Sequence, residues 1–249
     1  MEKSVHILEH FYLKVIVPIE VFGIDISITN LTLSMFAAAA VFLVLLILLA
    51  LKPKKVPGKR QVVIEMLLVF IKRNLVYNMI GKKEGDRWVP LIGGIFIFVL
   101  ANNLIGLIPG LYTPTSNPMV PVTLAVIVFF TVQITNLKMH GFKGIVRTLA
   151  PAAVPSWMYV IVVPIETISM IAKPFSLFIR LMANMLAGHT IIFVLFGLIL
   201  YFKSYFIAIP IVPFAVIMTI FELFVSAIQA YIFAVLSAMY IGEAVKPKH

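Results

Sequence analysis

The chain has 249 residues, of which 62% are hydrophobic and only 12% are charged, and its mean hydropathy is +1.09. Soluble domains are about half apolar and a quarter charged, so this composition excludes an ordinary soluble protein and indicates an integral membrane protein. The formal charge is +10, and half of the 20 lysines and arginines lie between Lys52 and Arg87. Because cytoplasmic loops collect such residues, the basic charge reflects topology and not binding of nucleic acid. The absence of cysteine excludes disulfides and thiol catalysis.

The first part of the chain, residues 1–30, is mixed in polarity and is predicted to lie at the outer membrane surface. The stretch HILEHFYLKVIV, residues 6–17, has a helical apolar face that is typical of a surface helix. No short basic region precedes an apolar core here, so no cleavable signal peptide is expected. Residues 31–51 are uncharged and would be about 30 Å long as a helix, which predicts a first membrane span.

The next part, up to residue 147, is predicted to hold two further spans and basic cytoplasmic loops. Within the charged segment 52–87, residues 61–80 keep apolar positions at helical spacing, which favours an amphipathic helix at the interface. A short re-entrant or partner-facing helix is the alternative. The spans are expected to begin near Trp88 and Met119, and Asn102 and Asn103 in the first of them are expected to form interhelical hydrogen bonds.

The basic loops predict an orientation, because lysine and arginine collect on the cytoplasmic side. Loops 52–87 and 138–147 would then face the cytoplasm, together with the C-terminal Lys246 and Lys248. The acidic N-terminus and the uncharged loop 110–118 would face outward.

Residues 155–245 contain two apolar stretches of about forty residues each, separated by the polar break at 201–205. A perpendicular span needs about 20 residues, so each stretch is either two spans or one long tilted helix. Neither stretch carries a tight turn signal near its middle, and Pro174 is compatible with a kink. This pattern favours two long, tilted helices in a hairpin. The fold class is therefore all-α: about five membrane helices plus one interfacial helix, in a single membrane domain over residues 1–249.

The first stretch carries ionisable residues that are costly in a membrane and therefore indicate a functional site. Glu166, Lys173 and Arg180 recur every seven residues, which places them on one helical stripe, and Asn184 lies close to it. His189 lies on the opposite face. Arg180 is the most demanding, because a guanidinium cannot lose its proton to avoid desolvation. Three simpler interpretations remain: Arg180 neutralised by Glu166 or lipid phosphate, His189 as a buried imidazole, and Lys173 extending to the interface.

A hairpin turn at 201–205 also predicts which residues of the two stretches face each other. It places His189 level with Glu222, the only carboxylate in the middle of the second stretch. The same register places Gln229 within one turn of Arg180. Chains of carboxylate, histidine and amide groups conduct protons through membranes, which points to ion translocation.

Three segments, KPFSLFIRLMANMLAGH, ELFVSAIQAYIF and NLIGLIP, closely resemble subunit a of the F-type ATP synthases. The similarity extends over most of the chain from about residue 24. It implies two long tilted helices packed against a rotating ring of c subunits. The order of His189 before Glu222 is similar to the alphaproteobacterial and mitochondrial branch of the family.

The resemblance also implies roles for individual residues. Arg180 would be the essential arginine that faces the ion-carrying carboxylates of the ring and couples ion flow to rotation. Asn184 and Gln229 would be its polar neighbours, and His189 and Glu222 would relay protons from the outer side. The cytoplasmic access path would contain Glu166, Ser169, Lys173 and Ser176.

The expected partners are the c-subunit ring, the peripheral-stalk b subunits, membrane lipid and, indirectly, the catalytic head of the synthase. The expected location is the bacterial inner membrane rather than the mitochondrial one, with the N-terminus outside. The chain shows no phosphate-binding glycine loop and no cluster of metal ligands. We therefore expect no cofactor, no metal and no active site for covalent chemistry in this subunit.

One alternative function is a stand-alone secondary transporter that binds an anionic substrate at Arg180. Such transporters often contain two similar halves with matched broken helices, and no such repeat is visible. A purely structural membrane scaffold is disfavoured by the intramembrane charges.

Overall fold

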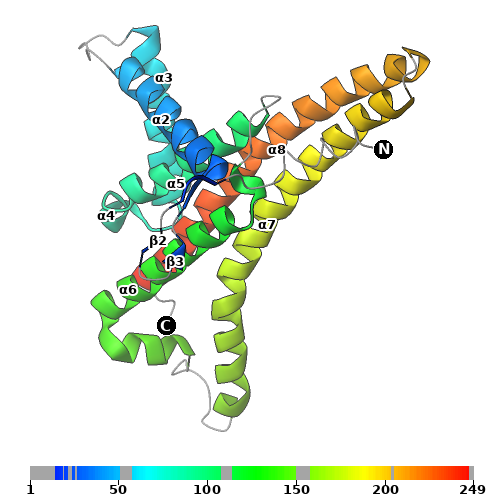
Figure 1. Cartoon of the computed structure of the whole chain (residues 1–249). Helices are drawn as coiled ribbons and strands as arrows, with labels where there is room; N and C mark the ends of the chain where they lie inside the picture. The colour runs from blue at the N-terminus through cyan, green and yellow to red at the C-terminus, as the bar shows by residue number, and fades with distance from the viewer. Residues whose placement is uncertain are drawn as a thin grey trace.

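The computed structural model describes residues 15–18, 20–21, 24–25, 27–50, 58–107, 114–149, 158–202 and 205–246. Its fold is built from helices, which confirms the predicted all-α membrane class (Figure 1). Four of its helical segments are long and apolar enough to cross a membrane, and a shorter apolar segment lies within a fifth helix, α2. The four are Val89–Gly106, Met119–Gly141, Tyr159–Phe202 and Phe206–Val245.

Two short antiparallel strand pairs precede the first helix. Strand β1 (Val15–Val17) pairs with β4 (Ile28–Thr29), and β2 (Glu20–Val21) pairs with β3 (Ile24–Asp25). The predicted surface helix over 6–17 is therefore wrong at 15–17, where β-branched valine and isoleucine favour the extended backbone. Its remaining residues, 6–14, lie outside the described part of the chain.

Helix α2 (Asn30–Ala50) agrees with the predicted first span. It begins directly after Thr29, whose hydroxyl oxygen accepts a hydrogen bond from the backbone N–H of Thr32 at 3.3 Å. Such a side-chain acceptor satisfies one of the N–H groups that a helix leaves unpaired at its start.

The predicted amphipathic helix is present as α3 (Lys59–Phe70), which continues into a π-helical segment, η2 (Ile71–Tyr77). The wider π-helical turn brings residues four and five apart closer to one face, and Ile71, Leu75 and Val76 are all buried. Segment η2 packs against α5 (Val89–Gly106) and α8 (Tyr205–Val245). Its C-terminal part thus belongs to the helical core.

Helix α6 (Met119–Leu149) is longer than the predicted third span. The stretch 138–147, predicted as a basic loop, is helical except at Gly141, where φ is +64° and the helix direction changes (Figure 1). Basic residues exclude a segment from the apolar membrane interior, but they are good helix formers. The two short helical segments between the other spans are α4 (Lys82–Gly85) and η3 (Pro114–Ser116).

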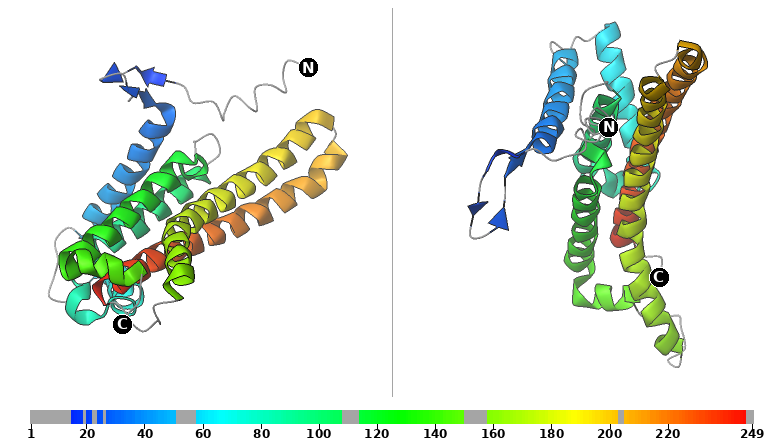
Figure 2. Two further views of the ribbon diagram at one scale, coloured as in Figure 1. Left: turned by 90° about the horizontal axis from the view of Figure 1, so that it is seen from below. Right: turned by 45° about the vertical axis from the view of Figure 1, so that its right-hand side comes forward.

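Helices α7 (Tyr159–Phe202) and α8 form the predicted hairpin, with 44 and 41 residues. Helices of this length are about 60 Å long, roughly twice the apolar thickness of a bilayer, so they must tilt strongly to remain inside it. Figures 1 and 2 show the two helices side by side, with the tip of the hairpin extending beyond the other helices. Helix α7 bends in its N-terminal half, the part that carries Pro164 and Pro174 (Figure 1).

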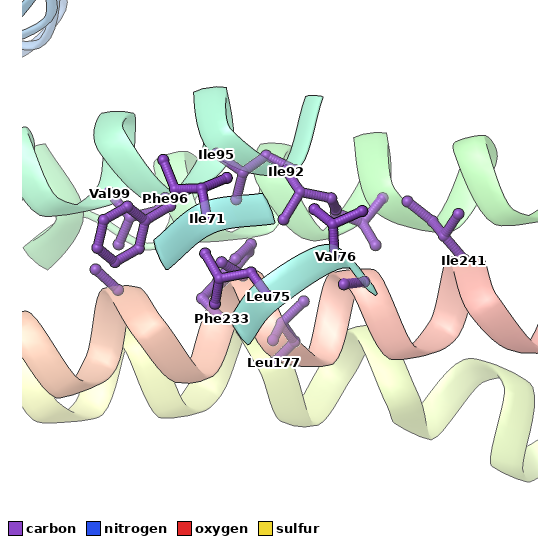
Figure 3. Packing of buried hydrophobic residues seen from close by; sticks show 14 of the residues in the cluster. Ile71, Leu75, Val76, Ile92, Ile95, Phe96, Val99, Leu177, Phe233 and Ile241 are labelled. Carbon is purple, nitrogen blue, oxygen red and sulfur yellow. The ribbon is translucent and has the colours of Figure 1, made fainter. Parts of the chain in front are cut away.

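The buried core lies where α8 meets α5, α7 and η2 (Figure 3). Phe233 and Ile241 of α8, Leu75 of η2 and Leu177 of α7 are at most 1% exposed. This packing holds α8 against three neighbours. The side chains of α8 that face α7 are therefore held in defined positions.

We predict that Gly242→Val destabilises the protein, because a β-carbon at Gly242 would lie 2.5 Å from the backbone carbonyl oxygen of Met79. Relief of that contact requires a backbone shift in the segment after η2. Thermal unfolding in detergent should show a lower Tm for this variant. A β-carbon on Gly94 of α5 would meet no other atom within 4 Å, so Gly94→Val is the matched control. An equal Tm for the two variants would contradict the prediction.

Candidate functional site

Arg180 lies on the exposed side of α7. The buried side of the same helix carries Leu177, Leu181 and Met185, all at most 1% exposed. Among the described residues, none forms an ion pair or hydrogen bond with Arg180. Glu166 is 14 residues away, about 21 Å along a helix, so neutralisation of Arg180 by Glu166 is wrong. The Arg180 side chain is thus exposed and has no counter-charge among the described residues.

One turn after Arg180, an amide pair joins the two helices of the hairpin. The side-chain N–H of Asn184 donates to Oε1 of Gln229 at 2.8 Å. Gln229 is 1% exposed, whereas Asn184 lies at the exposed surface near Arg180. This contact confirms the predicted register, in which Gln229 lies within one turn of Arg180.

Nearer the hairpin tip, the side chain of Glu222 enters the interface between α7 and α8. It is 4% exposed, and a β-carbon on Gly188 would lie 2.5 Å from its Oε1 atom. The absence of a side chain at Gly188 thus makes room for this carboxylate. Gly188 directly precedes His189, so the backbone of His189 lies level with Glu222 as predicted, while the His189 side chain is outside the described residues.

A buried polar cluster connects α8 with α5 and η3. Asn103 donates from Nδ2 to the backbone oxygen of Ser226 at 3.4 Å and accepts a hydrogen bond from the Thr115 hydroxyl at 2.8 Å. Its predicted interhelical role is confirmed. Asn102 instead donates to the carbonyl of Phe98 within α5, so its predicted interhelical hydrogen bond is not the one observed. The sequence prediction did not include Thr115, because its partner is 12 residues away across a turn.

On the other side of Arg180, a cavity of about 90 Å³ opens between α6, α7 and α8. The ammonium of Lys173 lies 2.7 Å from Oε2 of Glu243 and 5.4 Å from the ring centroid of Tyr240. Lys173 thus bonds across the hairpin, and its extension to the membrane interface stays a prediction. The polar residues that line the cavity are Gln133, Asn136, Glu166, Lys173, Tyr240 and Glu243.

The predicted cytoplasmic-path residues separate into two groups. Glu166 and Lys173 line the cavity, whereas Ser169 and Ser176 are not among its lining residues. Ser176 is exposed and Ser169 is half-buried. Glu243 was missed by the sequence prediction, although it lies 14 residues after Gln229 and 21 after Glu222. That multiple of seven places it on the same stripe of α8.

These features define a multi-helix membrane protein whose long, apolar hairpin carries a small number of charged and amide side chains. Comparison with known proteins identifies the family to which this membrane protein belongs. The family profile described as ATP synthase A chain matches residues 31–242, and the chain belongs to this family.

Several curated relatives have the same name, ATP synthase subunit a. The relative from Magnetococcus marinus is 41% identical over 95% of this chain and 92% of its own length. The relative from Myxococcus xanthus is 39% identical over 91% of this chain and 75% of its own. The relative from Mesorhizobium japonicum is 38% identical over 97% of each. These similarities do not support the stand-alone transporter as the function.

We predict that Gly188→Ala preserves the fold but displaces the Glu222 carboxylate, because the contact is with the end of a flexible side chain and not with backbone. Proton pumping driven by ATP in membrane vesicles should fall several-fold, with normal amounts of the subunit in the membrane. Gly197 of the same helix has open space around it, and Gly197→Ala should pump normally. Normal pumping by both variants would contradict the prediction.

Proposed function

We propose that the chain is the proton-channel stator subunit of an F-type ATP synthase, with two offset half-channels that lead to a ring of c subunits. The observation that carries the proposal is the position of Arg180. Its charge cannot be removed by deprotonation, it faces outward from the hairpin, and it has no ion-pair partner among the described residues. A carboxylate on a partner that passes this surface would supply the missing anion.

A fixed positive charge in this position explains how ion flow is coupled to rotation. The charge favours the ionised form of a passing carboxylate, so the carboxylate releases its proton there. The same charge repels protons that would cross directly from one half-channel to the other. Arginine suits this role better than lysine, because an ammonium in an apolar site can deprotonate.

Polar groups lie on both sides of Arg180 along the hairpin, which supports the two half-channels. In the proposal, His189 and Glu222 relay protons on the outer side, since imidazole both accepts and releases protons near neutral pH. Asn184 and Gln229 are the polar neighbours of the arginine. Glu166, Ser169, Lys173 and Ser176 belong to the cytoplasmic path.

The proposed partners are the c-subunit ring, the peripheral-stalk b subunits and, through them, the catalytic head of the synthase. The proposed location is the bacterial inner membrane. The outer-side N-terminus and cytoplasmic C-terminus follow from the excess of basic residues at 52–87 and 138–147.

We predict that Arg180→Ala abolishes ATP-driven proton pumping while passive proton leak persists or rises. A pH-sensitive dye in vesicles that contain the assembled synthase measures both. The loss follows from removal of the fixed charge that separates the two proposed half-channels.

Arg87 is also exposed but lies outside the spans, so Arg87→Ala is the matched control and should pump normally. Continued pumping by Arg180→Ala would show that Arg180 is structural and would overturn the proposed function.

A further inference from the structure

The cavity between α6, α7 and α8 contains two carboxylates but one ammonium. Glu166 and Lys173 enter it from α7, and Glu243 enters from α8. The third helix, α6, contributes the neutral side chains Gln133 and Asn136. The charged lining therefore carries one net negative charge, and the position of Lys173 decides which carboxylate remains uncompensated.

The geometry places Lys173 with Glu243. The distance of 2.7 Å between Lys173 Nζ and Glu243 Oε2 is that of a short, charge-assisted hydrogen bond. The ring of Tyr240 at 5.4 Å provides a second favourable contact for the ammonium. Glu166, in contrast, forms no ion pair or hydrogen bond with another described residue.

We infer that Lys173 is a positioning residue that neutralises Glu243 and thereby leaves Glu166 as the proton-exchanging carboxylate of this cavity. Glu243 then serves as a structural anion that anchors Lys173 across the hairpin. This inference rests on the proposed function, because it assigns parts within the cytoplasmic path.

The bend of α7 makes this ion pair important for the shape of the cavity. Pro174, directly after Lys173, lines the cavity, and α7 bends away from α8 in its N-terminal half (Figure 1). The Lys173–Glu243 contact links residues 70 apart in sequence near the place where the two helices diverge. It therefore joins α7 to α8 at the cavity that Glu166 also lines.

The test is a series of charge variants in vesicles that contain the whole synthase, with ATP-driven proton pumping as the measurement. Glu166→Gln should reduce the pumping rate by at least about tenfold, because a positioned acid–base group is lost. Glu243→Gln should also reduce it, because the released ammonium of Lys173 is then free to pair with Glu166. The double variant Lys173→Gln with Glu243→Gln restores the single negative charge of the lining and should pump several-fold faster than Glu243→Gln alone, as expected for coupled residues.

A conservative substitution distinguishes the positioning role of Lys173 from a purely structural one. Lys173→Arg should pump faster than Lys173→Gln, because a guanidinium also bonds to a carboxylate and an amide leaves Glu243 without its counter-charge. Both Lys173 and Glu243 are 40% or more exposed, so the neutral double variant leaves no buried charge, and subunit content in the vesicles should be unchanged.

Three results would overturn the inference. They are normal pumping by Glu166→Gln, normal pumping by Glu243→Gln, and failure of the neutral double variant to recover. Arg180→Ala is assayed in parallel: if it does not pump while any of these three results is obtained, the proposed function stands and only the inference about Lys173 fails.

Discussion

Ala230, Ala234, Ala238 and Gly242 recur every four residues on one side of α8, and all four are buried. Small residues at this spacing allow helix backbones to approach closely. Close approach increases the van der Waals packing that contributes to helix association in membranes. At Gly242 the neighbouring backbone leaves no room for a β-carbon. These close backbone contacts allow little change in the position of α8. Helices α5 and α7 and segment η2 pack against α8, so their arrangement depends on that position.

Close packing of α8 determines which side chains of α7 are available to partners. Helix α7 packs through Leu177, Leu181 and Met185. Arg180 lies about 100° around the helix from Leu181, on the flank of this stripe, and it is exposed. A positive charge without an ion-pair partner among the described residues is costly in an apolar environment, which supports the proposal that a partner supplies an anion.

The sequence was sufficient to predict the long hairpin, with one helix ending at Phe202 and the next beginning at Tyr205, and the proximity of Gln229 to Arg180. The length of the two apolar stretches, the polar break between them and the helical spacing of the polar residues carry these predictions. It was insufficient where structure depends on distant contacts. The helical continuation of α6 beyond Lys138 was missed because charge indicates position relative to the membrane and not backbone conformation. Glu243 was missed because its role depends on Lys173, which approaches it only after the hairpin folds.

Polar groups lie along α7 on both sides of Arg180. Lys173 lies seven residues before Arg180 and Gly188 lies eight after it, which are distances of about 10 and 12 Å along a helix. The cavity at Lys173 and the Glu222 carboxylate at Gly188 are thus on opposite sides of the arginine. Between them lie the buried side chains of Leu177, Leu181 and Met185 and the amide pair of Asn184 and Gln229. In the proposed function, a proton that enters at one side meets the fixed charge of Arg180, so its passage to the other side requires a carrier outside the chain.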